Sequence, residues 1–188
     1  MDRHSDLAAE GNPQKKPRPM IPYLPKQNLT IVAVGDALEA NAVRATLEGL
    51  NYRTTTHWIG SRAELLKLLA GEIPTDDTVV LSCHGDEQGI LVPEEPPITA
   101  ADLRTHARLD GKTIVNLGCE THAMAAAFHA AGASHYIAPT DSPDGTAALA
   151  FVTNLFFLRT YDVPLDEAVR RAAAFHPECE QFQLNRIS

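Results

Sequence analysis

The sequence lacks most of the features that mark membrane, secreted or disulfide-rich proteins. Only three of its 188 residues are cysteines, an odd and small number that provides no disulfide framework. Its longest apolar stretch, 145–158, contains Thr and Asn and is too short to span a bilayer. No apolar segment follows Met1, so no signal peptide is predicted, and we expect a cytoplasmic protein with reduced thiols. Cys179 lies in a polar stretch and is expected to be incidental.

Basic residues are also in the minority. Sixteen Lys and Arg residues oppose 24 Asp and Glu residues, and the resulting net charge of −8 argues against a nucleic-acid ligand. Residues 1–28 differ from the rest because they hold five of the 13 prolines and more basic than acidic side chains. We predict a disordered or extended segment at 1–28, with a docking or regulatory role as the alternative to a merely solvated leader, and one domain at 29–188.

From Leu29 onward, short β-branched runs alternate with helical patterns. Strands are predicted at 29–34, 52–58, 78–82, 113–117 and 134–138, with a short extension or hairpin at 89–92. Helices are predicted at 36–49, from 61 onward, and at 99–107, 121–131, 143–159 and 165–175. In the fifth of these helices, Ser142 is the expected cap and Pro143 the first helical residue. This alternation predicts an α/β fold, a three-layer α/β/α sandwich with a mostly parallel central sheet.

Two residues with chemical potential follow buried strands directly. His84 comes after the strand 78–82, and Cys119 comes after the strand 113–117. Reactive groups gather at the carboxyl edge of parallel sheets, so these side chains can face one gap if their strands are neighbours. We expect a dyad with Cys119 as nucleophile, favoured by the helix expected near Thr121, and His84 as general base. The N–H groups of Gly85 and Cys119 would form an oxyanion hole.

The residues around both positions resemble the caspase-like (clan CD) cysteine peptidase superfamily. The segment VVLSCHGDEQGILV is similar to the part of that fold in which a strand runs into His-Gly. Cys119-Glu120-Thr121, with the small-residue helix and Ala-Gly-Ala turn that follow, resembles the CHAT branch of the superfamily. The resemblance covers about 79–174. It implies a caspase-like fold and a cysteine endopeptidase or peptidase-related module with His84 as base and Cys119 as nucleophile.

Two acidic residues are candidates for binding substrate. Asp141 follows the strand expected beside the nucleophile strand, where the resemblance implies part of the pocket for the residue before the cleaved bond (P1). Asp141 and Asp86 would pair with a basic P1 side chain, and turn or capping chemistry is the alternative for both. We expect a protein or peptide substrate and a regulatory protein partner. We expect no nucleic acid, membrane, cofactor or metal.

Three other functions were weighed against the peptidase. A catalytically silent caspase-like scaffold would keep the fold and bind a partner. A metal site would recruit Cys83, His84, Cys119 and His122, but strand alternation should turn Cys83 away from His84. A receiver-like signalling domain would need an acidic pair after the first strand, where only Asp36 stands, and an aspartate after the third.

Overall fold

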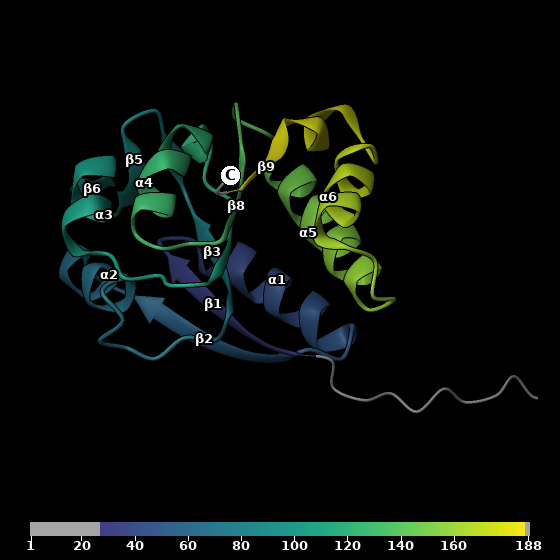
Figure 1. Cartoon of the computed structure of the whole chain (residues 1–188), viewed down its shortest axis with the longest axis horizontal. Coiled ribbons are helices and arrows are strands. Elements are labelled where there is room, and N and C mark those ends of the chain that lie inside the picture. The colour runs from purple at the N-terminus through teal and green to yellow at the C-terminus, as the bar shows by residue number, and fades with distance from the viewer. Residues whose placement is uncertain (1–26, 187–188) are drawn as a thin grey trace, which may run out of the picture.

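A six-stranded sheet lies between two layers of helices in the computed structural model, which describes residues 27–186 (Figure 1). Its strand order is β2-β1-β3-β7-β8-β9. The strands are β1 (Asn28–Val34), β2 (Arg53–Ile59), β3 (Thr78–Cys83), β7 (Thr113–Asn116), β8 (His135–Pro139) and β9 (Phe182–Arg186). All neighbours pair in parallel except β9, which is antiparallel to β8. The predicted sandwich with a mostly parallel sheet is therefore confirmed. The segment predicted at 1–28 lies outside the described residues, apart from its last two.

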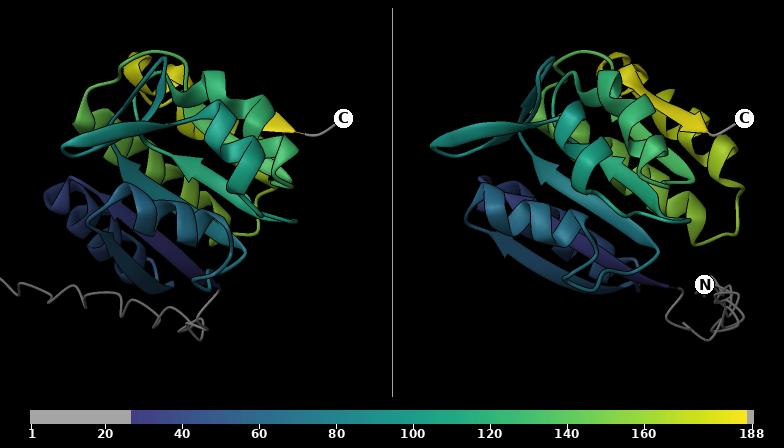
Figure 2. Two further views of the ribbon diagram at one scale, coloured as in Figure 1. Left: turned by 90° about the vertical axis from the view of Figure 1, so that its left-hand side faces the viewer. Right: turned by 60° about the vertical axis from the view of Figure 1, so that its left-hand side comes forward.

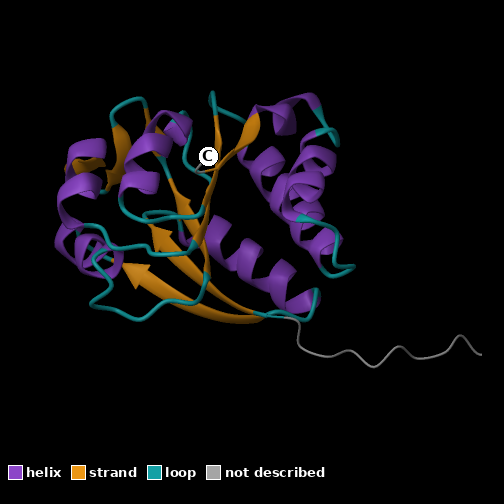
Figure 3. Cartoon of the chain, viewed as in Figure 1, coloured by secondary structure: helices purple, strands orange, loops and turns teal. Residues whose placement is uncertain are grey.

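Within residues 27–186, three helices cover each face of the sheet (Figure 3). One face carries α1 (Ala37–Gly49), α5 (Gly145–Arg159) and α6 (Leu165–Ala173); the other carries α2 (Arg62–Leu69), α3 (Ala100–His106) and α4 (Ala125–Ala130). Successive strand residues point to opposite faces, so alternate apolar residues of the central strands enter different cores. In β1, for example, Ile31 packs toward α1 and α5, whereas Val32 packs toward α2.

A small second sheet continues directly from the end of β3. Its antiparallel strands are β4 (Gly85–Asp86), β5 (Gly89–Val92) and β6 (Glu95–Thr99). Figure 2 shows the teal β5–β6 hairpin projecting from the body of the molecule. The Leu91 N–H donates to the His84 carbonyl over 3.0 Å, so the hairpin is fastened to the chain where β3 ends. The predicted hairpin at 89–92 is confirmed, and it forms one wall beside His84.

The starts of α1 and α2 are each capped by a polar side chain. The Asp36 carboxylate accepts hydrogen bonds from the Leu38 and Glu39 N–H groups, and the Ser61 hydroxyl accepts one from the Glu64 N–H. These contacts satisfy backbone donors that the first turn of a helix leaves without partners. The α1 cap holds Asp36 at the carboxyl end of β1, next to the end of the neighbouring strand β3.

Two predicted helix boundaries were wrong. The helix predicted at 143–159 begins at Gly145 and is capped by Asp144, whose carboxylate accepts from the Thr146 N–H, because the Ser142 hydroxyl donates to Glu120 instead. The helix predicted at 121–131 is divided into a 3-10 turn, η1 (Thr121–Met124), and α4. The Thr121 hydroxyl donates to the Gly118 carbonyl, which tightens the start of this segment.

The polar stretch after α6 is structured rather than incidental. A 3-10 turn, η2 (Pro177–Gln181), leads into β9. Cys179 is fully buried and its thiol donates to the Ala147 carbonyl, so the prediction that it is incidental was wrong. Phe182 stacks on Phe151 with 4.2 Å between ring centroids, which binds β9 to α5. Between residues 27 and 186, the longest helices fall short of the length and apolar character that a membrane span requires.

Candidate active site

The segments that follow β3 and β7 are in direct contact. The two strands are neighbours, with Leu81 paired to Asn116, so their carboxyl ends meet at one edge of the sheet. A Cβ atom added to Gly85 would lie 2.4 Å from the Thr121 Cγ2 and 2.8 Å from the Cys119 carbonyl oxygen. Real Cβ atoms do not approach other atoms so closely, so this packing requires glycine at position 85. The two strands are therefore neighbours, which is the condition under which His84 and Cys119 can face one gap.

The side chains at this edge differ in accessibility. The His84 side chain is 66% exposed, so its imidazole is open to a ligand. Cys119 is partly buried, whereas Cys83 and Cys179 are fully buried, and all three cysteines are free. A thiol must be reached by its substrate in order to react, so Cys119 is the cysteine suited to chemistry.

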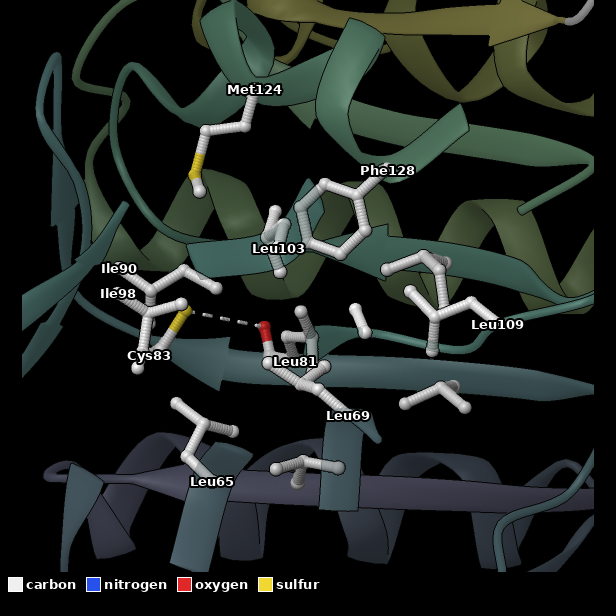
Figure 4. Packing of buried hydrophobic residues seen from close by; sticks show 14 of the residues in the cluster. Leu65, Leu69, Leu81, Cys83, Ile90, Ile98, Leu103, Leu109, Met124 and Phe128 are labelled. Carbon is white, nitrogen blue, oxygen red and sulfur yellow. Dashed lines mark hydrogen bonds between the residues drawn. The ribbon is translucent and has the colours of Figure 1, made fainter. Parts of the chain in front are cut away.

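Cys83 faces the hydrophobic core, although it precedes His84 directly. Figure 4 shows its sulfur among isoleucine and leucine side chains on the α2 side of the sheet. The thiol donates to the Asn116 Oδ1 over 3.2 Å, and burial raises its pKa far above the ordinary value. His122 lies elsewhere, with its Nδ1 3.2 Å from the Asn185 side chain. The four residues weighed as a metal site are thus not gathered, and residues 27–186 contain no cluster of three or more metal-ligating side chains.

A buried hydrogen-bond network fixes the segment between β7 and η1, which we call the Cys119 loop, to the central sheet. The Asn116 Oδ1 accepts from the Gly118 N–H over 2.9 Å, and its Nδ2 donates to the Tyr136 hydroxyl over 3.0 Å. The Tyr136 hydroxyl in turn donates to the Thr121 carbonyl over 2.8 Å. Asn116, Thr121 and Tyr136 are fully buried, so no water competes for these bonds. Residues on both sides of Cys119 are thereby fixed to the sheet.

Glu120 has an unusual backbone conformation beside Cys119. Its φ of 58° lies in the left-handed region, which costs a non-glycine residue about 1 kcal/mol or more. The Glu120 N–H donates to the Asp141 carbonyl over 3.0 Å, and its carboxylate accepts from the Ser142 hydroxyl. These contacts hold the strained residue and connect the Cys119 loop to the loop after β8. Stored strain of this kind is typical of functional sites.

The two acidic residues expected to bind substrate have different surroundings. Asp141 is exposed, and its backbone contacts the residue that follows Cys119. The Asp86 carboxylate accepts from the Gln88 and Gly89 N–H groups across the tip of the β4–β5 turn. Asp141 thus joins the Cys119 loop through its main chain, whereas Asp86 has a turn-stabilising role in addition to any contact with a ligand.

Asp36 is an acidic neighbour of His84 that was not among the site residues predicted from the sequence. Its Oδ2 lies 3.9 Å from the His84 Nε2, while its Oδ1 holds the start of α1. Glu39, one turn further along α1, accepts from the buried Ser82 hydroxyl over 2.6 Å, and burial raises the pKa of its carboxyl. The strand-end rule that singled out His84 and Cys119 also applies to β1, and it could have identified Asp36.

Two solved structures share this fold. The chain is similar to the separase in the Saccharomyces cerevisiae separase–securin complex, with a TM-score of 0.59 and 11% identity over 86% of this chain and 12% of that chain. It is also similar to the Arg-specific cysteine proteinase gingipain R, with a TM-score of 0.54 and 12% identity over 85% of this chain and 44% of that chain. The chain therefore spans less than half the length of either protein. Searches of protein-family models and of curated proteins found no match.

Both of these proteins are caspase-like cysteine peptidases of clan CD. The mostly parallel central sheet and the helices that cover it thus match a caspase-like fold, as the sequence resemblance implied.

Proposed function

We propose, from the caspase-like fold and the contact between the two strand ends, that this protein is a cysteine endopeptidase with Cys119 as nucleophile and His84 as general base. The observation that carries the proposal is the packing of Gly85 against Cys119 and Thr121, which brings the segment with an exposed imidazole against the segment with the accessible thiol. The left-handed Glu120 and the buried network under the loop support it, because both fix the position of Cys119.

The reaction would follow the chemistry of acyl transfer to a thiolate. His84 takes the proton of Cys119, and the thiolate attacks the substrate carbonyl carbon, forming a C–S bond. The N–H groups of Gly85 and Cys119 donate to the oxyanion that develops. When the C–N bond breaks, His84 gives its proton to the leaving amine, and it then activates the water that hydrolyses the thioester. The Asp36 carboxylate, 3.9 Å from the imidazole, stabilises the imidazolium formed between these steps.

A basic P1 residue fits the acidic surroundings of this site. Asp141 is exposed and contacts the Cys119 loop, and Asp86 follows Gly85 directly. Glu120 adds a third carboxylate beside the nucleophile. One of the two similar structures is described as Arg-specific. We therefore propose Arg or Lys at P1, bound by Asp141 with Asp86 in a supporting role.

The same resemblance suggests the wider setting of the enzyme. Cys119-Glu120-Thr121, the small residues of α4 and the Ala-Gly-Ala turn after it suggest the CHAT type. The separase that this chain resembles is described in complex with another protein, securin. We propose a cytoplasmic peptidase that acts on proteins or peptides and is controlled by a protein partner.

A biotinylated peptidyl electrophile ending in Arg tests the dyad. We expect the intact mass of the wild type to increase by one label, Cys119→Ala to remain unlabelled, and His84→Ala to react at least about 100-fold more slowly. Cys179→Ser is the matched control, because it removes a buried thiol from another part of the molecule, and it should label like the wild type.

Other results would reject parts of the proposal. Labelling of Cys119→Ala at the wild-type rate would exclude Cys119 as the nucleophile. A folded protein whose Cys119 reacts no faster than an ordinary thiol would favour the silent scaffold. Cleavage of a peptide panel after Asp but not after Arg or Lys would end the proposal of a basic P1 residue.

A further inference from the structure

An apolar hollow of about 320 Å³ opens beside His84. Its walls come from the end of β1, the end of β3 and the projecting hairpin, and they consist of Val34, Gly35, His84, Leu91, Val92 and Pro93. His84 is the one polar side chain among these residues. The hollow is narrow at Gly35, because a Cβ atom there would lie 3.0 Å from the Pro93 Cγ. The positive φ of Gly35, 83°, also disfavours any side chain at this point.

The hollow and Cys119 lie on opposite sides of His84. In the sheet, β3 has β1 on one side and β7 on the other. The hollow is lined by the end of β1, whereas Cys119 follows β7. A peptide bound across this edge therefore passes from the Cys119 loop, over His84, to the hollow.

We propose that this hollow binds an apolar side chain on the residue that follows the cleaved bond, the P1′ residue. The inference rests on the proposed function, in which His84 protonates the leaving amine. That nitrogen belongs to the P1′ residue, so the P1′ side chain begins two bonds from the atom that His84 protonates. Because the acyl half stays bonded to Cys119 on the β7 side, the leaving half is directed to the β1 side, where the hollow lies.

The lining determines the class of side chain. Leu91 is a large apolar residue with 36% of its surface exposed, and together with Val34, Val92 and Pro93 it offers a surface that gains by contact with another apolar group. A charged P1′ side chain would lose water against these apolar walls, among which His84 is the one polar side chain. The site therefore selects leucine, isoleucine, valine, methionine or phenylalanine over serine, glycine or a charged residue at P1′.

An unbiased peptide library tests this selection. The full chain is incubated with a mixture of peptides of balanced composition, and the cleavage sites are located by mass spectrometry, which reports the residues before and after each cleaved bond separately. A hydrophobic pocket typically discriminates between related side chains by tenfold or more, so we expect leucine at P1′ to exceed serine by at least about tenfold in kcat/KM.

Three variants separate the hollow from the dyad. Leu91→Ser should reduce the ratio of kcat/KM for leucine over serine at P1′ by about tenfold. Leu91→Met keeps an apolar wall and should retain the preference. Phe175→Ser is the matched control, because Phe175 is 61% exposed and lies beyond α6, away from the hollow.

The possible failures are distinguishable. Absence of any cleavage by the wild type would refute the proposed function, and the inference would fall with it. Cleavage that is indifferent to the P1′ residue, or that favours charged residues there, would refute the inference alone. An unchanged preference in Leu91→Ser would also refute it, because the apolar selection would then come from another part of the molecule.

Discussion

The hydroxyl group of Tyr136 offers a sharp test of how the fold positions Cys119. Tyr136→Phe keeps the ring, which stacks on Phe128 with 4.3 Å between centroids, and removes only the oxygen that joins Asn116 to Thr121. The Asn116 Nδ2 and the Thr121 carbonyl then lose a partner in a fully buried environment. Leaving a buried polar group unpaired costs about 1–3 kcal/mol, so the free energy of unfolding should fall by about 2–3 kcal/mol.

Tyr52→Phe provides the matched control. The Tyr52 hydroxyl is also buried and donates to the Phe156 carbonyl over 3.1 Å, but that carbonyl keeps the Thr160 N–H as a second partner. Its loss should cost about 1 kcal/mol, as for an ordinary hydrogen bond. Tyr52 lies among the residues packed around α1 and α5, so this substitution should leave the Cys119 loop undisturbed.

Urea unfolding and labelling with the Arg-ending electrophile measure the two effects. With a slope of about 2 kcal/mol per M, Tyr136→Phe should lower the midpoint by about 1 M and Tyr52→Phe by about half as much. Small displacements of a reacting group are costly, so labelling of Cys119 should slow about tenfold in Tyr136→Phe and remain unchanged in Tyr52→Phe. Equal labelling rates in Tyr136→Phe and the wild type would refute the positioning argument.

Three further substitutions test the contacts around the site. Gly85→Ala should lower the free energy of unfolding, measured in urea, by about 1–3 kcal/mol and abolish labelling of Cys119. Gly49→Ala is the control and should have neither effect, because its Cβ atom would meet nothing within 4 Å. A Gly85→Ala protein that labels like the wild type would contradict the packing argument. Asp36→Asn keeps the α1 cap but loses the charge beside His84. We expect kcat to fall about threefold at constant KM, with little change in the free energy of unfolding. An unchanged kcat would contradict this role of Asp36. Burial raises the pKa of Glu39 above 4.5, so the contribution of this carboxyl to stability is full below that pH and is lost as pH rises through the folded-state pKa. The free energy of unfolding of Glu39→Gln, measured in urea relative to the wild type, should therefore be higher at pH 7 than at pH 4. The same difference from the wild type at both pH values would contradict this prediction.

Most strands of the central sheet could be predicted from the sequence because they are buried on both faces. Runs such as 29–34 and 78–82 are almost continuously apolar and β-branched, and turns or helix caps bound them. The rule that chemistry gathers at strand ends then made His84 and Cys119 the candidate site residues without any coordinates. The contact between their segments follows from the pairing of β3 with β7, which sequence alone does not fix.

β9 was not predicted, because a short strand at the edge of a sheet can form without the alternation of apolar and polar residues that marks a strand in a sequence. Its outer side is open and only Phe182 of its five residues is fully buried, so the alternation that marks a strand is almost absent. The start of α5 was misplaced for a different reason. Ser142 is a good capping residue by local rules, but its hydroxyl bonds to Glu120 from a distant loop, and Asp144 takes over the cap.

The supporting residues of the site were hidden by a second role or by distance. Asp36 caps α1 with one carboxylate oxygen, and its other carboxylate oxygen faces His84. Asn116 and Tyr136 come from separate strands, and no spacing in the sequence relates them. A buried asparagine in an otherwise apolar strand is disfavoured, and this was the one local sign that Asn116 has a specific partner.

The antiparallel β9 strand has a consequence for the order in which the molecule is built. Synthesis delivers residues 182–186 to the nascent chain after every other described element. Until they dock, β8 lacks its outer partner, and the Thr140 N–H lacks the Gln181 carbonyl that it meets in the native fold. The loop that carries Asp141 thus gains one of its contacts only after β9 has docked. A chain still on the ribosome would therefore have the neighbouring strands β3 and β7 available before this contact of the Asp141 loop can form.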